Sequence, residues 1–140
     1  MAAALAAARA EYEISRVAFG DLFLEDIRRY REIRMHDSGL VPLFPLWGLP
    51  TSALARDMVR GGLKAQITCI DPRLLDPAFA GRRFDDGFLD DLPAGVDPCG
   101  EHGEFHSFAY AGPMFSKPIP VQIAEVTGRD GFVFADLLLP

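Results

Sequence analysis

The densest group of chemically capable side chains lies in one short stretch of the sequence. Its carboxylates and imidazoles can accept and transfer protons, and its glycines let a backbone approach a ligand closely. If Glu104 opens a strand, Glu104 and His106 point to one face of it and Phe105 points to the other. The alternative is a polar loop leading into an edge strand, with glycines that serve only to form turns. The stretch reads Asp97-Pro98-Cys99-Gly100-Glu101-His102-Gly103-Glu104-Phe105-His106.

The same stretch contains residue types that bind zinc. Their spacing matches no standard zinc pattern, and the remaining histidine of the chain, His36, falls on a distant predicted helix. We therefore predict no metal, and a small metal-binding domain stays as an alternative. Its ligands would be Cys99, His102 and His106, with Glu101 or Glu104.

A second set of candidates lies near the amino-terminal end. Asp21 follows Gly20 at the predicted end of a parallel strand, where ligand-contacting carboxylates gather. Its carboxylate is also suited to cap the next helix. Arg28 and Arg31 can bind phosphate or carboxylate groups, although basic runs of this kind are more often the solvated face of a helix.

The elements that must position these residues follow an α/β order. We expect a helix over 1–13, a strand at 16–19 and a helix over 24–37. Between Gly39 and Pro50, three prolines are expected to interrupt regular structure and to form a linker between domains. Phe44 and Trp47 in this linker are expected to bury against the next domain, or to form an aromatic wall for a planar ligand.

The second half of the chain has clear turn and strand signals. Thr51 is expected to cap a helix that Gly61 and Gly62 end, and a strand follows at 64–70. Residues 73–92 are expected to be helical in pieces, before a strand over 104–110. The segments 121–127 and 132–138 flank Gly128-Arg129-Asp130-Gly131 and predict a β-hairpin.

Composition narrows the classes of function. The chain has 140 residues, of which 49% are apolar and 24% charged, as expected for a folded domain rather than a disordered tail. No apolar run reaches the roughly 18 to 20 residues that span a bilayer. A net charge of −6 argues against binding to nucleic acid phosphates. Cys69 and Cys99 fit a reducing compartment, so we predict a cytoplasmic location.

Four segments of the sequence form a recognisable series. They are Gly20-Asp21 with Glu25-Asp26-Ile27-Arg28 and Tyr30-Arg31-Glu32, Pro42-Leu43-Phe44-Pro45-Leu46-Trp47, Gly81-Arg82 with Phe84-Asp85, and Asp97 to Ser107. In this order they resemble the diphthine–ammonia ligase family. The family is also described as diphthamide synthase, among the PP-loop ATP-binding adenine nucleotide alpha hydrolases.

The resemblance implies a two-part α/β enzyme. Residues 1–40 would be the carboxyl-terminal part of a PP-loop (HUP-like) parallel α/β nucleotide-binding domain. Residues 41–140 would form a small α+β domain on the substrate side, with the Gly-Glu-x-Gly-Glu motif. In family members that make diphthamide, ATP, with Mg²⁺, adenylates the carboxylate of diphthine on elongation factor 2. Ammonia then displaces AMP and leaves an amide.

The resemblance also implies roles for individual positions. Glu101 and Glu104 would be catalytic, and Gly20 and Asp21 would contact the nucleotide. The middle residue of the motif, usually Asn or Gly, is His102 in this chain. The substrate would be bound by Gly100, Gly103, Phe105 and His106.

The chain departs from the family pattern in one respect. It has no Ser-Gly-Gly-Lys-Asp-Ser loop to hold the ATP phosphates. We therefore expect a truncated ligase chain that does not bind ATP tightly by itself, and whose bare strand at 16–19 favours self-association. The alternatives are a non-catalytic binding or assembly module that needs a separate nucleotide-binding domain, and an adenine nucleotide alpha hydrolase with a different substrate.

Overall fold

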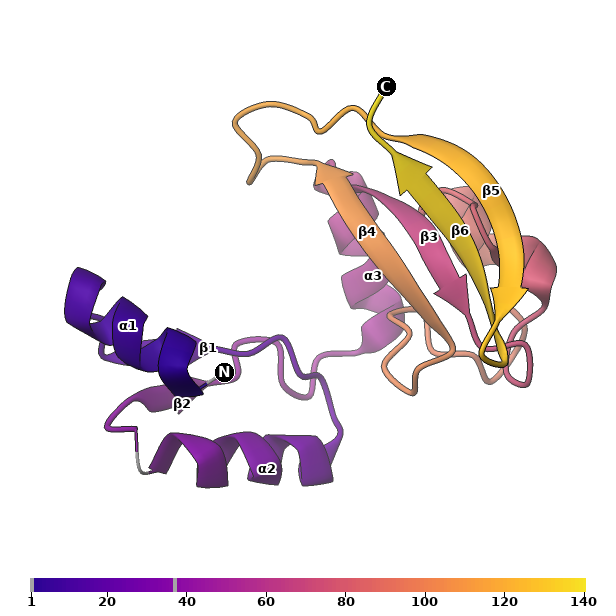
Figure 1. The fold of residues 1–140 in the computed structure, drawn as a ribbon. Coiled ribbons are helices and arrows are strands. Elements are labelled where there is room, and N and C mark those ends of the chain that lie inside the picture. The colour runs from indigo at the N-terminus through magenta and orange to yellow at the C-terminus, as the bar shows by residue number, and fades with distance from the viewer. Residues whose placement is uncertain (1, 37) are drawn as a thin grey trace. The chain divides into compact units, whose positions relative to one another are not determined.

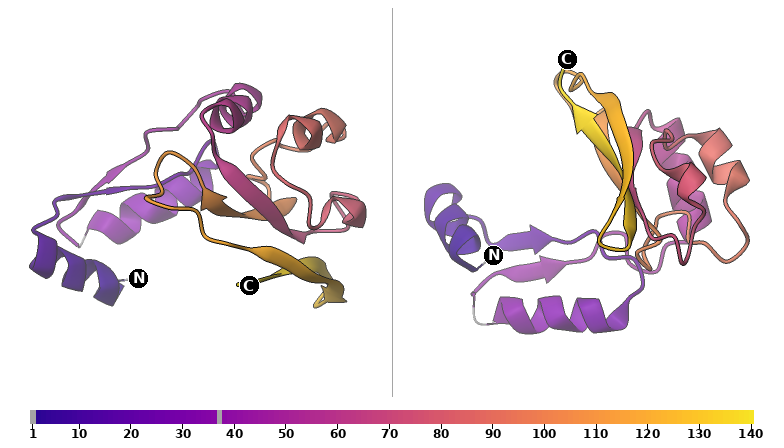
Figure 2. Two further views of the ribbon diagram at one scale, coloured as in Figure 1. Left: turned by 90° about the horizontal axis from the view of Figure 1, so that it is seen from above. Right: turned by 45° about the vertical axis from the view of Figure 1, so that its right-hand side comes forward.

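The computed structural model describes residues 2–36 and 38–140 and divides into two compact units (Figures 1 and 2). Unit 1 runs up to Leu49, and unit 2 runs from Pro50 to Pro140. Unit 1 contains a two-stranded parallel sheet, whereas unit 2 contains a four-stranded antiparallel sheet. The predicted fold class, an α/β chain with a small α+β carboxyl-terminal part, is therefore confirmed. Among the described residues, no helix is both long and apolar enough to cross a membrane.

Unit 1 alternates helix and strand. Its elements are α1 (Ala2–Tyr12), β1 (Arg16–Ala18), α2 (Glu25–His36) and β2 (Val41–Leu43). The strands pair in parallel, with Arg16 opposite Val41 and Ala18 opposite Leu43. Because parallel neighbours need a crossover, α2 connects the end of β1 to the start of β2. The carboxyl ends of both strands therefore lie at the same end of the sheet.

The expectation that prolines interrupt regular structure after Gly39 is wrong for β2. Pro42 lies inside this strand, opposite Val17. A two-stranded sheet has only edge strands, and an edge strand tolerates a proline because one side of it makes no ladder hydrogen bonds. At the other predicted boundaries, Met1 and Asp37 lie outside the described residues.

Unit 2 packs short helices against one face of its sheet (Figure 2). The strand order is β4-β3-β6-β5, and every neighbouring pair is antiparallel. In chain order the elements are α3 (Thr51–Arg60), β3 (Lys64–Ile70), η1 (Pro77–Phe79), α4 (Asp86–Asp91), β4 (Phe105–Ala111), β5 (Gln122–Arg129) and β6 (Phe132–Leu138).

Aromatic side chains fill the core of unit 2. Phe88 of α4 is fully buried, and its ring centroid lies 5.6 Å from that of Phe84 and 5.2 Å from that of Phe105. Ile67 and Ile70 of β3 are also fully buried in this core. Phe105 is the first residue of β4, so the core holds the chain where the preceding polar loop joins the sheet.

Local signals predict this unit well, with one correction. The hairpin turns at Asp130 and Gly131, whose φ angles of 53° and 80° fit the type I′ turn that Asp-Gly favours. The predicted cap at Thr51 is wrong, because Pro50 occupies the N-cap position of α3 without any side-chain cap bond. Pro50 has an extended backbone, and Thr51 is already helical.

Candidate functional site

The 97–104 loop joins α4 to β4 and contains most of the predicted site residues. Its two glycines have left-handed backbones, with φ angles of +70° at Gly100 and +83° at Gly103. A Cβ at Gly100 would approach the carbonyl oxygen of Phe105 to 2.8 Å. Around Gly103 nothing lies within 4 Å of such a Cβ. Gly100 is therefore required by close packing as well as by conformation, Gly103 by conformation alone.

The Glu104 carboxylate is turned back into this loop. Its side chain is only 4% exposed. Its Oε1 accepts the backbone N–H of Asp97 at 2.9 Å, and its Oε2 accepts that of His102 at 3.0 Å. The His102 Nδ1 lies 3.4 Å from Oε1, an ion pair when the imidazole is protonated. Each carboxylate oxygen is thus occupied by a main-chain donor.

Asp97 is the second buried carboxylate of the loop. It is 7% exposed, and its Oδ2 accepts the backbone N–H of Glu101 at 2.9 Å. Its own carbonyl accepts the N–H of Gly100 at 2.9 Å. Asp97 and Glu104 together therefore bind the main chain at the start of the loop, residue 97, and at its tip, residues 101 and 102.

The remaining predicted residues of this stretch lie in different surroundings. Glu101 is half-buried, whereas His102 and His106 are exposed. The expected shared face of Glu104 and His106 does not form, because Glu104 precedes β4 and points into the loop. The ring of Phe105 packs in the core against Phe88, so Phe105 supports the loop from the core side.

Cys99 belongs to the packing of the loop. Its Sγ lies 3.6 Å from the carbonyl oxygen of Thr51, and its side chain packs against the core. Burial, together with the nearby Asp97 and Glu101 carboxylates, raises the pKa of the Cys99 thiol to about 11. Across residues 2–36 and 38–140, no group of three His, Cys, Asp or Glu side chains is arranged to hold a metal ion.

The end of β3 is joined to the loop. The backbone N–H of Asp71 donates to the carbonyl oxygen of Glu104 at 3.0 Å. The Asp71 carboxylate is buried and binds the Arg73 guanidinium through both oxygens, with Nε–Oδ1 at 2.8 Å and Nη2–Oδ2 at 2.5 Å. These hydrogen bonds from Arg73 lower the pKa of Asp71 to about 2. A fixed cation therefore lies in the turn next to the loop.

Gly20 and Asp21 belong to unit 1, directly after the carboxyl end of β1. Gly20 is exposed, and nothing lies within 4 Å of a Cβ built on it. The Asp21 Oδ2 lies 3.5 Å from the Arg31 Nε, and the two side chains are 13% and 30% exposed. Asp21 thus forms an ion pair with α2, although neither of these two atoms has a hydrogen-bond partner.

The arginines of α2 stack on aromatic rings. The guanidinium carbon of Arg28 lies 4.8 Å from the ring centroid of Phe44 and 4.7 Å from that of Trp47. That of Arg31 lies 5.0 Å above the ring of Phe19, which stacks on Phe44. Arg28 and Arg31 are therefore packed among rings at the carboxyl ends of the parallel strands, and not on a purely solvated helix face.

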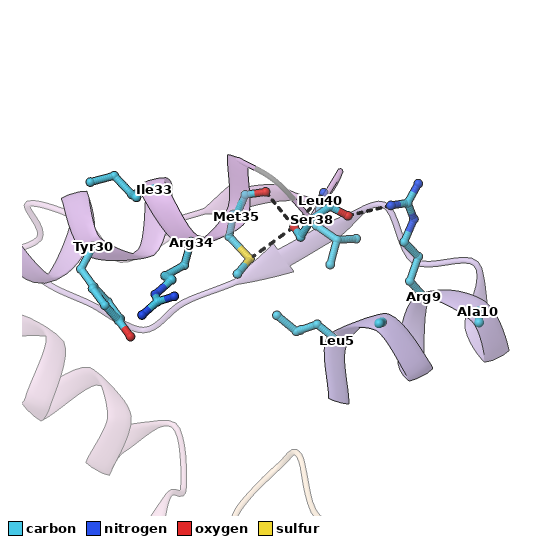
Figure 3. Close-up of a pocket in the computed structure, with 10 residues that line it drawn as sticks. Leu5, Arg9, Ala10, Tyr30, Ile33, Arg34, Met35, Ser38 and Leu40 are labelled. Atoms are coloured by element: carbon cyan, nitrogen blue, oxygen red, sulfur yellow. Dashed lines mark hydrogen bonds between the residues drawn. The ribbon is translucent and has the colours of Figure 1, made fainter. Parts of the chain in front are cut away.

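A groove of about 970 Å³ runs between α1 and α2 within unit 1 (Figure 3). Leu5 and Ile33 border it, and Ile33 is 61% exposed. The Arg9 Nη1 donates to the carbonyl oxygen of Ser38 at 2.6 Å, which ties α1 to the connection between α2 and β2. The groove is thus an open, largely apolar surface with an arginine at its edge.

Two features of these sites could not be predicted from the sequence. Asp97 belongs to the polar stretch, yet only the folded loop shows that its carboxylate reaches the N–H of Glu101. The signal in the sequence is the spacing of four residues between Asp97 and Glu101, over which a side chain can reach back to its own loop. The stacking of Arg28 depends on rings that lie far along the chain, and no local pattern predicts it.

Comparisons with known proteins give one consistent result. Residues 50–135 match the family described as the diphthamide synthase C-terminal domain. Diphthine–ammonia ligase from Homo sapiens is 32% identical over 115 residues, which cover 76% of this chain and 43% of the human protein. Those from Bos taurus and Mus musculus are 31% and 33% identical, over 88% of this chain and 48% of each relative.

The chain thus spans about half the length of the curated relatives it matches. The match to the family covers nearly all of unit 2, including the 97–104 loop and the whole core. This chain belongs to the diphthamide synthase C-terminal domain family.

Proposed function

We propose that unit 2 supplies the acceptor side of an amide-forming ligase, which joins a carboxylate to ammonia. The observation that carries this proposal is the 97–104 loop. Its backbone is held by two buried carboxylates, and it presents a half-buried Glu101 and an exposed His102. The relatives are named diphthine–ammonia ligases, so the substrates we propose for this chain are ammonium and diphthine on elongation factor 2.

The proposed chemistry assigns different roles to the two glutamates. A carboxylate attracts ammonium and can take a proton from it, which generates the nucleophile. We assign this role to Glu101, whose side chain is less buried than that of Glu104. Glu104 contributes by holding the loop, with its two oxygens on main-chain donors. Gly100, Gly103 and the exposed His106 would border the substrate.

ATP with Mg²⁺ would supply the activation of the carboxylate by adenylation. The turn between β1 and α2 does not fit the phosphates of ATP. The first turn of α2 carries Glu25 and Asp26, which repel phosphate from its N-terminus. Arg31 is engaged by Asp21 and Phe19. We therefore propose Gly20 and Asp21 only as contacts for the nucleoside part.

The test is amide formation on elongation factor 2 that carries diphthine, with ATP, Mg²⁺ and ammonium, followed by intact mass. The chain is assayed alone and together with the amino-terminal half of the human relative. Glu101→Gln should lower turnover by about 10² to 10⁴-fold, because it removes a proton acceptor. Glu125→Gln on the exposed strand β5 is the matched control. Unchanged turnover with Glu101→Gln would remove Glu101 from the chemistry.

The groove of unit 1 favours a second candidate function, that of an assembly module for a separate α/β domain. Parallel sheets are generally covered and have more strands than two, so β1 and β2 lack the usual surroundings of such a pair. In this reading Ile33→Glu abolishes binding to the amino-terminal half of the human relative in analytical ultracentrifugation. Leu74→Glu, at a 49% exposed site of unit 2, is the control. Equal binding by both variants would reject the groove as the contact.

A further inference from the structure

Asp97 is one of the two buried carboxylates that hold the loop, but the function proposed above gives it no part in the reaction. Burying a carboxylate is costly unless hydrogen bonds compensate. Here the compensation comes from three backbone N–H groups, of Asp97, Glu101 and His102, at 2.9 to 3.0 Å. Hydrogen bonds from N–H groups to a carboxylate are about twice as strong as neutral ones.

The three donors are placed unevenly along the loop. Two of them belong to consecutive residues, Glu101 and His102, and each of these is bound by a different carboxylate. The third donor, the N–H of Asp97, links the two carboxyl residues to each other. Glu101 is therefore held through the peptide units on both sides of its Cα, by its own N–H and by that of His102. No other segment of the loop is fixed in this way by side chains.

A simple turn does not need this arrangement. Gly100 and Gly103 already close the loop through backbone bonds, from the Gly100 N–H to Asp97 and from the Gly103 N–H to Gly100. The two carboxylates are therefore not needed to form the turns. They fix the orientation of the main chain at Glu101, which is what a site needs to hold a reacting group in place.

We propose that Asp97 and Glu104 form a carboxylate clamp that positions Glu101, with Asp97 as a positioning residue for the ligase reaction. This inference rests on the function proposed for the loop. The clamp acts through the backbone of Glu101 and touches no substrate itself. Loss of the clamp moves the Glu101 carboxylate, whereas the Glu101 side chain itself stays chemically unchanged.

The first arm of the experiment is NMR hydrogen exchange on the whole chain. Asp97→Ala should speed exchange of the Glu101 amide about tenfold or more, because that amide loses a charged acceptor. Asp97→Asn retains an acceptor oxygen and should restore most of the protection. The control is Asp85→Ala, which removes an equivalent bond to the Phe88 N–H at the start of α4. It should leave the Glu101 amide unchanged.

The second arm is the ligase assay, in which kcat and KM are measured separately. Misplacing a reacting group by about 1 Å costs on the order of 10²-fold, so Asp97→Ala should lower kcat by about that factor. The KM for elongation factor 2 should change less than threefold, and Asp97→Asn should recover at least tenfold of the lost kcat. Asp85→Ala should keep the wild-type kcat, although it also removes a helix cap.

The two arms separate this inference from the function on which it rests. If the Glu101 amide exchanges equally fast in wild type and Asp97→Ala, the clamp is wrong, whatever the ligase assay gives. If the amide responds but kcat does not, the clamp is structural and positions nothing for the reaction. If the wild-type protein forms no amide, the proposed function fails, and the positioning role falls with it.

Discussion

Carboxylates in unit 2 are stabilised in two different ways, and each has its own consequence. Asp97 and Glu104 bind main-chain N–H groups, so they determine the conformation of the loop. Asp71 binds the guanidinium of Arg73 in addition to a backbone N–H, so it makes the stability of the fold depend on pH. The thiol of Cys99 lies beside the first pair and takes its properties from burial.

Asp71 makes the free energy of unfolding of unit 2 decrease at acidic pH. Because the pKa of Asp71 is lowered to about 2 in the folded state, the unfolded chain binds more protons at mildly acidic pH. The stabilisation is complete above the ordinary pKa near 4 and is lost as the pH falls towards 2. Asp71→Asn and Arg73→Gln should both remove this part of the pH dependence in urea unfolding. An unchanged slope between pH 4 and 2 would contradict the ion pair.

Both cysteines should react slowly in the native protein. The raised pKa of Cys99, about 11, leaves roughly a thousandth of its thiol as thiolate at pH 8. Burial also raises the pKa of Cys69. Alkylation by iodoacetamide, followed by mass spectrometry, should therefore be far slower in the native chain than in urea. Rapid labelling of Cys99 in the native chain would show that the loop does not cover it.

At the scale of elements, the 97–104 loop is fixed to its surroundings at several points. Phe105 anchors its end in the aromatic core, the Asp71 N–H joins it to the end of β3, and Cys99 packs against the core. Gly100 lies against the carbonyl and ring of Phe105. The loop is therefore part of the packed structure of unit 2.

The two glycines of the loop provide a matched test of this packing. Gly103→Ala should cost about 1 to 2 kcal/mol, because a left-handed backbone disfavours a Cβ. Gly100→Ala should cost more, since its Cβ would also meet the Phe105 oxygen at 2.8 Å and the ring at 3.2 Å. Urea unfolding of both variants measures the difference. Equal losses would mean that the loop moves away from Phe105 without penalty.

The sequence predicts the elements that carry their own local signals. β3 is predicted at its observed bounds, because its apolar and β-branched residues are a sufficient signal. The Asp130-Gly131 pair predicts the turn between β5 and β6. β2 is missed, because Pro42 argues against a strand and only the pairing with β1 overrides it. In the site, residue types locate the 97–104 loop, but not the direction of the Glu104 side chain. That direction depends on N–H groups which only the folded loop brings together.

At the scale of the whole molecule, the two units differ in how much they bury. The main hydrophobic cluster is made of residues of unit 2. Within the described part of unit 1, the buried apolar side chains are Leu22, Met35 and Leu40, and the sheet has two short strands. Since a single core usually carries the stability of a small domain, we expect unit 2 to be the more stable part.

Residues 50–140 produced alone should fold and unfold cooperatively as a monomer. The whole chain should self-associate as its concentration rises, because unit 1 presents strand edges and an apolar groove. Analytical ultracentrifugation and thermal melting compare the two. A whole chain that stays monomeric, with amides of unit 1 as protected as those of unit 2, would contradict this prediction.

The three hydrogen bonds that hold the loop in the clamp come from main-chain N–H groups, and this has a consequence for how the loop can evolve. Every residue except proline has a backbone N–H, so substitutions of Glu101 and His102 leave those hydrogen bonds in place. Random mutagenesis of codon 102 should therefore yield folded protein with most residues, with proline excluded. Substitutions can therefore change the side chains of the loop while its backbone conformation stays the same.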